Sequence, residues 1–543
     1  MDPNRNNGTP RNSGYYRPNF YNSNYPSTAT IDKDSIVSRF EILPPRKETL
    51  FARRPSDDFI EPENSNSRKR SSFKSRLADF FSFTTLNRAA LILTAVLVVM
   101  VFLIPIILSQ TKNKSKAPYD PTGLSVFSKS DYEYIAMAKN SSSKGQPLVP
   151  KVLPIDPETP ASAGFFTNIN GEKLKLVFSD EFNTDGRKFG PGEDSIWEAQ
   201  DLHYYGTNDL EYYSPEQATT KNGKLILTLE NKVTVEPFNY TSGMLNSWNK
   251  FCFQGGYIEV RASFPGDGKV PGYWPAAWTL GNLGRAGYGA TNDGLLPGQR
   301  LNACVCSGDH PSPGIGRGAP EIDIFEGTVE WGGLQSLSMS LQVAPFDHQY
   351  TLNNNYTTFK DVVFPNSSSP RVGTTIPNTY TGGFLQQSVS SVHYVDNSVS
   401  GGNEFGVYGF EYIPGPNGFI QYYVNQQPTF RVDSKAVGPN PSSKVGQRVI
   451  PEEPMYILLN LGFSNSFGAI DFENIKFPAN LQFDYVRLYQ DPNNIRLSCD
   501  PEDRPTAQYI MDHPRAYYNK DLRYWNQTGY GTPSYDINKG CNK

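Results

Sequence analysis

The sequence carries almost no net charge for its length. Its 50 Lys and Arg residues nearly balance 54 Asp and Glu residues, so the 543-residue chain has a formal charge of -4 at pH 7. Proteins that bind nucleic acids draw much of their affinity from phosphate contacts and carry strongly basic surfaces. The charge balance therefore argues against a nucleic-acid partner.

Cysteine is scarce as well. The five cysteines are Cys252, Cys304, Cys306, Cys499 and Cys541. An odd number leaves at least one thiol free or paired between chains, and the spacing does not determine the connectivity. Cys499 and Cys541 bracket the C-terminal tail and are candidates for a bridge within it, whereas Cys304 and Cys306 lie too close together for an easy mutual bridge. With His310 as the neighbouring ligand, the latter pair makes a poor zinc site, and we expect no metal there.

Helical periodicity is missing from residues 161–490. Short alternating or aromatic runs stand in its place, including LKLVFSDEF, KLILTLEN, GGYIEVRASF, LSMSLQV, MYILLNLGF and LQFDYVRLYQ. Such runs, separated by Gly, Pro and Asn turns, are typical of antiparallel strands. We predict an all-β domain that folds as a two-sheet sandwich. Residues 283–318 and 366–403, rich in Gly, Ser and Asn, are interpreted as structureless insertions that form lids or decorations.

One long apolar run stands apart from this pattern. Residues 89–108, AALILTAVLVVMVFLIPIIL, hold no charge, and their single polar residue is Thr94. Twenty helical residues span roughly 30 Å, the thickness of a hydrocarbon core. A signal peptide would have a shorter apolar core nearer the N-terminus, and a buried helix would usually keep a polar stripe. We predict a transmembrane helix that contacts membrane lipid.

The flanks of this run indicate its orientation. Basic residues precede it at Arg68, Lys69, Arg70, Lys74, Arg76 and Arg88, and follow it at Lys112, Lys114 and Lys116. The excess before the run places the N-terminus in the cytosol. Every cysteine lies after the run, as expected for an oxidising compartment. Five predicted glycosylation sequons lie there too, at Asn140, Asn239, Asn355, Asn366 and Asn526.

These features divide the chain into five segments. We predict a disordered cytosolic tail (1–88), a signal anchor (89–108), a stem (109–160), the β domain (161–490) and a polar tail packed on that domain (491–543). The basic run in the first segment resembles a nuclear-import or nucleic-acid patch, but beside a membrane span it is more simply an orientation signal. We therefore expect a single-pass type II membrane protein with its β domain lumenal or extracellular.

The run PEIDIFEGT holds three acids in a strand-like context, Glu321, Asp323 and Glu326. Period-two alternation places Glu321 and Asp323 on one face, and one extra residue in a β-bulge would return Glu326 to that face. Acids crowded on one surface repel one another and destabilise the fold. Such a cluster therefore indicates a site whose chemistry requires acids with different pKa values.

Retaining glycoside hydrolysis needs such a set. Glu321 would be the nucleophile, Glu326 the general acid/base, and Asp323 the group that orients Glu321 and keeps Glu326 protonated. The alternatives are a surface strand with scattered acids and a cation site.

Neighbouring aromatic residues favour the carbohydrate interpretation. VPGYWPAAWTLGN supplies Trp274 and Trp278, and indole faces stack on the apolar faces of pyranose rings. Both are candidate substrate contacts, although core packing is the stronger interpretation for Trp278. Further candidates in HYYGTNDLEYY are Tyr204, Tyr205, Asn208 and Glu211.

Taken in order, LVFSDEFN, GGYIEVRASFP, YWPAAW, EIDIFEG, YGFEYIPGPNGFIQYYVN, YILLNLGF and FDYVRLYQ resemble glycoside hydrolase family 16, the laminarinase-like group. The resemblance covers about residues 165–490. It implies a concanavalin-like β-jelly roll, in which ExDxxE is the bulged catalytic motif formed by Glu321, Asp323 and Glu326. EFGVYGFEY lacks a His that many members carry in this strand. The resemblance implies no cofactor except a possible structural calcium at Asp484.

The order of tail, anchor and exported domain resembles fungal type II membrane proteins associated with β-1,6-glucan synthesis. This resemblance implies cell-wall β-glucan assembly by a retaining glycosidase or transglycosylase, with β-glucan polysaccharide as the partner. It also implies a location along the secretory pathway, in the endoplasmic reticulum and Golgi, and at the plasma membrane. The alternative is a non-catalytic glucan-binding assembly factor. A sugar-binding receptor is a third interpretation, but the cytosolic tail shows no signalling module. Linkage specificity and oligomeric state stay open.

Overall fold

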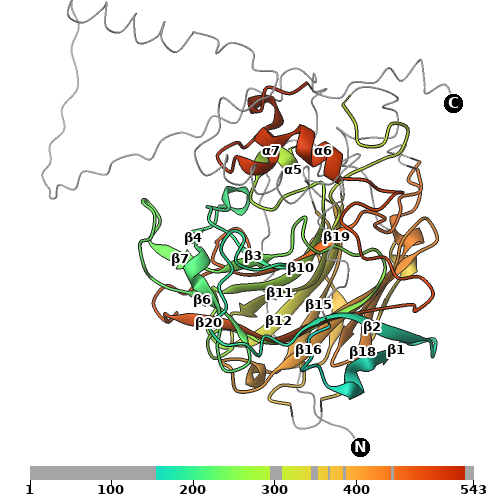
Figure 1. Ribbon diagram of the computed structural model, residues 1–543. Coiled ribbons are helices and arrows are strands. Elements are labelled where there is room, and N and C mark those ends of the chain that lie inside the picture. The colour runs from blue at the N-terminus through green and yellow to red at the C-terminus, as the bar shows by residue number, and fades with distance from the viewer. Residues whose placement is uncertain are drawn as a thin grey trace, which may run out of the picture. The chain divides into compact units, whose positions relative to one another are not determined.

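A computed structural model describes residues 155–293, 309–343, 353–364, 367–382, 387–441 and 446–531 (Figure 1). The predicted cytosolic tail and membrane span, and nearly all of the stem, lie outside these residues. Within the described part of the chain, no helix is both long enough and apolar enough to cross a membrane.

Two antiparallel sheets form the body of the domain, which confirms the all-β prediction. The first sheet has ten strands. Its main order is β1 (Phe165–Thr167), β2 (Lys173–Asp180), β20 (Ala479–Gln490), β9 (Gly256–Ser263), β16 (Gly406–Ile413), β17 (Phe419–Val424), β18 (Gln427–Asp433) and β13 (Thr357–Phe359). From β20 the sheet branches to β6 (Leu225–Leu229) and β5 (Ala218–Thr220).

The second sheet has eight strands and carries the predicted acids. Its order is β14 (Thr375–Pro377), β15 (Gln387–Val395), β12 (Leu334–Val343), β11 (Glu321–Glu330), β10 (Trp274–Gly281), β19 (Met455–Gly462), β8 (Met244–Asn246) and β3 (Glu198–Ala199). A separate parallel pair joins β4 (Glu211–Tyr213) to β7 (Tyr240–Ser242).

The helices among the described residues are short and lie in the connections and the C-terminal tail. The α-helices there are α5 (Gly289–Asn292), α6 (Ala507–Asp512) and α7 (Pro514–Tyr518). The 3-10 turns are η4 (Ala161–Gly164), η5 (Tyr205–Thr207), η6 (Pro215–Gln217), η7 (Asn354–Tyr356), η8 (Asn397–Val399), η9 (Ser434–Val437) and η10 (Trp525–Gln527).

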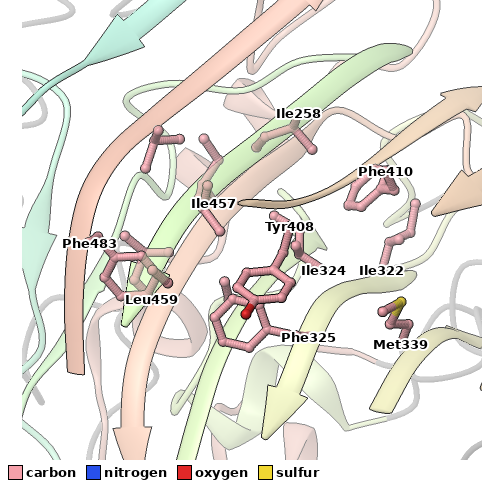
Figure 2. Packing of buried hydrophobic residues seen from close by; sticks show 14 of the residues in the cluster. Ile258, Ile322, Ile324, Phe325, Met339, Tyr408, Phe410, Ile457, Leu459 and Phe483 are labelled. Atoms are coloured by element: carbon pink, nitrogen blue, oxygen red, sulfur yellow. The ribbon is translucent and has the colours of Figure 1, made fainter. Parts of the chain in front are cut away.

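The core lies between the two sheets. Alternate apolar residues of both sheets meet there, and Figure 2 shows Ile322 and Ile324 of β11 beside Tyr408 and Phe410 of β16. All four side chains are at most 1% exposed. Burial of one large apolar side chain contributes about 1.5–3 kcal/mol, so this packing fixes which face of each strand points inward. The opposite face of the second sheet, which bears Glu321, Asp323 and Glu326, is called the acid-bearing face below.

One of the two predicted insertions is wrong. Residues 366–403 contain β14 and the nine-residue strand β15, which pairs with β12 along its whole length. Val389 and Val395 of β15 enter the core. The apolar alternation of this strand is weak, because serines take three of its nine positions.

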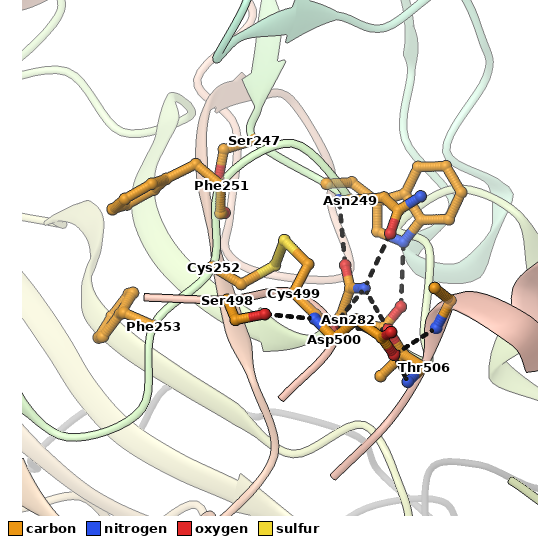
Figure 3. Close-up of a disulfide and its surroundings, with 12 residues drawn as sticks. Ser247, Asn249, Phe251, Cys252, Phe253, Asn282, Ser498, Cys499, Asp500 and Thr506 are labelled. Atoms are coloured by element: carbon orange, nitrogen blue, oxygen red, sulfur yellow. Dashed lines mark hydrogen bonds between the residues drawn. A yellow bond between two sulfur atoms is a disulfide. The ribbon is translucent and has the colours of Figure 1, made fainter. Parts of the chain in front are cut away.

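The C-terminal tail is tied to the domain by a disulfide between Cys252 and Cys499 (Figure 3). Cys499 is therefore not paired with Cys541, the candidate partner considered from the sequence. The two paired residues are 247 positions apart in sequence, but folding brings their Cα atoms within 4.7 Å. The spacing of the cysteines in the sequence does not indicate which of them lie close together in the fold. Cys304, Cys306 and Cys541 lie outside the described residues.

Candidate active site

The bulge predicted from the ExDxxE spacing is present in β11. Asp323 pairs with Ser340 of β12, and Glu326 pairs with Ser338, so three steps along β11 match two along β12. Both residues between the acids, Ile324 and Phe325, turn into the core. The extra residue thereby returns Glu326 to the face that bears Glu321 and Asp323.

Amide, hydroxyl and indole donors hold the three acids. Gln342 Nε2 donates to Glu321 Oε1 at 2.6 Å and to Asp323 Oδ2 at 2.8 Å. The Ser340 hydroxyl also donates to Asp323. At the other end, Trp274 Nε1 donates to Glu326 Oε1 at 3.2 Å. Each acid therefore has a donor that restricts its orientation.

Burial raises the pKa of all three acids, and the charges of neighbouring acids raise those of Glu321 and Glu326 further. Burial raises the pKa of Asp323 to about 6, with hydrogen bonds from Ser340 and Gln342 opposing the shift. Burial, followed by the charges of Asp323 and Glu326, raises the pKa of Glu321 well above its usual value. Burial and the charge of Asp323 do the same to the pKa of Glu326, against the Trp274 hydrogen bond. The set can thus keep a proton near neutral pH, as a general acid requires.

The two predicted tryptophans have different surroundings. Trp274 is half-buried and stacks on Phe467, with ring centroids 4.3 Å apart and the planes 1° from parallel. Trp278 is 8% exposed, and its Nε1 donates to Asn460 Oδ1 at 2.7 Å. It belongs to an apolar cluster, here called the tail-facing cluster, that includes Leu202, Tyr213, Met244, Trp248, Ala276, Leu280, Tyr456, Leu458, Ile510, Tyr517 and Trp525.

The four remaining candidates are dispersed. Burial and then the charge of Glu321 raise the pKa of the half-buried Tyr204, which places its ring near the acids. The Tyr205 hydroxyl donates to the Arg523 carbonyl at 3.0 Å, and the exposed Asn208 donates to Ser466 at 3.3 Å. Glu211 is fully buried, so its carboxylate has no path to a polysaccharide in this structure.

The comparisons with known proteins decide the family. Residues 48–297 and 295–541 match the family model described as "Beta-glucan synthesis-associated protein SKN1/KRE6/Sbg1". The chain belongs to this family. That result confirms the resemblance to proteins associated with β-glucan synthesis.

The relatives differ in how much of their length is matched. The Saccharomyces cerevisiae proteins named SKN1 and KRE6 are each 41% identical over an alignment of 418 positions, gaps included, that covers 71% of this chain. The chain spans 52% and 56% of their lengths, about half of each. Candida albicans KRE6 is 33% identical over an alignment of 586 positions, gaps included, that covers 98% of this chain and 75% of that relative. A laminarinase catalytic domain from Thermotoga maritima is similar at 21% identity and a TM-score of 0.38, covering 59% of this chain and 99% of that domain.

The calcium expected at Asp484 does not fit the side chains around it. The carboxylate of Asp484, on β20, forms an ion pair with Arg261 of β9, so a guanidinium already occupies its cation side. Among the described residues, no three His, Cys, Asp or Glu side chains gather as a metal site would require. His310 accepts a hydrogen bond from the Ser312 amide, and the CVC cysteines lie outside the described ranges.

Three of the predicted glycosylation sites can be located. Asn239, Asn355 and Asn526 are exposed, whereas Asn140 and Asn366 fall outside the described residues.

Sequence reasoning missed Ser340 and Gln342, the residues that hold Glu321 and Asp323. The signal was present in LSMSLQV. Once Leu337, Met339 and Leu341 are assigned to the core, alternation places Ser338, Ser340 and Gln342 on the acid-bearing face. Asn460 was missed as well, because it is one polar position in the otherwise apolar run of β19.

Proposed function

We propose that this chain acts in the biosynthesis and assembly of cell-wall β-glucan, β-1,6-glucan in particular, as a retaining glycosidase or transglycosylase. The observation that carries the proposal is the bulge in β11, which collects Glu321, Asp323 and Glu326 on one face. The names of the relatives support β-glucan as the polymer.

The proposed reaction proceeds in two displacements. In the first, Glu321 attacks the anomeric carbon while the glycosidic carbon–oxygen bond breaks, and Glu326 gives its proton to the leaving oxygen. In the second, a water or glucan hydroxyl attacks the glycosyl ester and gives its proton to Glu326, which frees Glu321.

Asp323 acts through the other two acids. Its charge raises the pKa of Glu326 and keeps that acid protonated before the first displacement. Gln342 bridges Asp323 and Glu321 and orients the nucleophile.

A glucan-binding assembly factor without chemistry is the second candidate. It is favoured by the tail-facing cluster, which buries Trp278 and other side chains of the acid-bearing face. Because the cluster covers part of the acid-bearing face, fewer side chains of that face can contact a sugar ring placed at the acids.

Incubation of the purified full chain with defined β-1,3 and β-1,6 oligosaccharides separates the two. An enzyme yields shorter products, or longer ones by transfer, and Glu321→Gln yields neither although it still binds. Products from Glu321→Gln equal to those of the unchanged chain would contradict the catalytic proposal, and binding without any turnover by the unchanged chain would favour the assembly factor.

We further propose type II topology, with the β domain in the lumen of the secretory pathway or outside the cell. The support is the basic flank before residue 89 and the exposure of Asn239, Asn355 and Asn526.

A further inference from the structure

The acid-bearing face is divided by β11 into two unlike halves. On β10, β19 and β8, its side chains include Trp278, Leu458 and Met244, all at most 8% exposed within the tail-facing cluster. Segments from the C-terminal tail pack in the same cluster, with Tyr517 stacked on Trp248 at a centroid separation of 5.9 Å. A polysaccharide therefore cannot lie over Trp278, Leu458 and Met244 without displacing the tail, whereas Trp274, at the other end of β10, is half-buried and lies outside the cluster.

The other half, on β12, β15 and β14, is lined differently. The side chains of Ser338 and Ser390 lie 3.1 Å apart, and Asn378, directly after β14, donates to Ser390 at 3.0 Å and to Ser338 at 3.4 Å. Ser338 and Asn378 are half-buried, and Ile376 beside them is 43% exposed. This half has partial access to solvent and carries hydroxyl and amide groups.

A buried hydroxyl without a partner lies next to this group. Ser388 pairs with Gln342 and so takes the position on the acid-bearing face that precedes Ser390. Its Oγ has no hydrogen-bond partner within the described part of the chain, although the side chain is 1% exposed. A buried hydroxyl without a hydrogen-bond partner destabilises the folded state by about 1–3 kcal/mol. If a ligand bonds to that hydroxyl, this loss of stability is offset in the complex.

We propose that Ser338, Ser390 and Asn378 form a subsite that binds one glucosyl unit of the glucan through its hydroxyl groups. The inference rests on the proposed function and adds the location and chemistry of sugar recognition. A ring can be bound by stacking its apolar face on an aromatic side chain or by bonding its hydroxyls at the edge. The group of two hydroxyls and one amide supports edge binding.

The subsite belongs to the sugar on the leaving or acceptor side. Ser338 is the direct cross-strand partner of Glu326, so their Cβ atoms lie about 5 Å apart. The acid/base group contacts the glycosidic oxygen in the first displacement and the incoming hydroxyl in the second. The subsite beside Glu326 therefore holds the departing sugar in the first displacement. In the second displacement, the same subsite holds the acceptor sugar.

The test uses the purified full chain and two double variants. S338A/S390A removes both hydroxyls, whereas S338T/S390T keeps them on a residue that favours strands. Titration with β-1,3 and β-1,6 oligosaccharides of two to six units should show roughly tenfold weaker binding by the alanine variant, from the loss of one or two hydrogen bonds. The loss should appear only in oligosaccharides long enough to reach the subsite, and the threonine variant should stay within about twofold of the unchanged chain.

Thr228→Ala is the matched control. Thr228 donates to Asn480 at 2.9 Å on the outward face of the first sheet, so this change removes a similar hydroxyl-to-amide bond far from the acids. Its glucan affinity should not change. Equal affinity of S338A/S390A and the unchanged chain at every length would overturn the subsite while leaving the proposed function intact. No binding by the unchanged chain would overturn both.

Should S338A/S390A fail to fold, Asn378→Ala tests the same bonds from a residue outside the strand. The expected loss is then about threefold to tenfold, and an unchanged affinity would again overturn the subsite.

Discussion

At the scale of single residues, burial of Asp323 in the site lowers the stability of the folded protein at neutral pH. It is 1% exposed, and burial raises its pKa from 3.8 to about 6. The folded state therefore holds a proton that the unfolded state releases between about pH 4 and pH 6. Linkage then requires stability to fall as the pH rises through this window, because the folded state binds more protons than the unfolded state.

Replacement of Asp323 by Asn should therefore stabilise the protein at neutral pH. The amide has no charge to bury, and the pKa values of Glu321 and Glu326 should fall once this neighbouring charge is gone. We expect the free energy of unfolding at pH 7 to rise by about 1–3 kcal/mol, with the difference vanishing near pH 4. Chemical denaturation of both proteins across this pH range measures it, and glucan turnover should fall sharply.

Asp396 provides the control of opposite sign. Partial burial raises its pKa, but hydrogen bonds from Ser368 and Ser398 outweigh that effect and lower it overall. Asp396→Asn should leave stability unchanged or lower at pH 7. A stability profile of Asp323→Asn that runs parallel to that of the unchanged chain would contradict the account of the buried acids.

Among the elements, those whose apolar and polar positions alternate were predictable. The run of β11 predicted both the strand and its bulge, because three acids spaced by two and three residues share a face only through an extra residue. The serines of β15 concealed that strand. The contacts of α6 and α7 were out of reach, because each depends on residues more than two hundred positions away, such as the Arg285 bond to the Tyr517 carbonyl.

The attachment of the tail yields a second prediction. The Cys252–Cys499 bridge joins residues 247 positions apart, and around it Asn282 donates to Thr506 at 2.9 Å (Figure 3). Loss of a native disulfide that closes a long loop costs about 2–5 kcal/mol. Cys252→Ser should therefore lower the melting temperature by several degrees.

Double replacement of Cys252 and Cys499 should cost no more than the single change, because one bond is lost in both cases. Equal melting temperatures for the single variant and the unchanged chain, both under oxidising conditions, would argue against the bridge.

At the scale of the whole molecule, the two flanks of the predicted membrane span should lie on opposite sides of the membrane. Endoglycosidase should reduce the apparent mass of the native protein, and Asn239→Gln, Asn355→Gln and Asn526→Gln should each remove one glycan. Protease added to sealed microsomes should trim the N-terminal tail and spare residues 161–490. Removal of those residues with the tail left intact would show the reverse orientation.

The central claim is that Glu321 forms a covalent bond to the sugar. The direct measurement is mass spectrometry of the full chain carrying Glu326→Gln after incubation with a 2-deoxy-2-fluoro β-glucosyl substrate that has a good leaving group. Such a substrate needs little acid assistance to form the ester, and the variant lacks the base that would speed its breakdown. We predict one added glycosyl mass on the peptide that contains Glu321, and none when Glu321→Gln is also present. A glycosyl group on another residue, or none while the oligosaccharide still binds, would contradict the account.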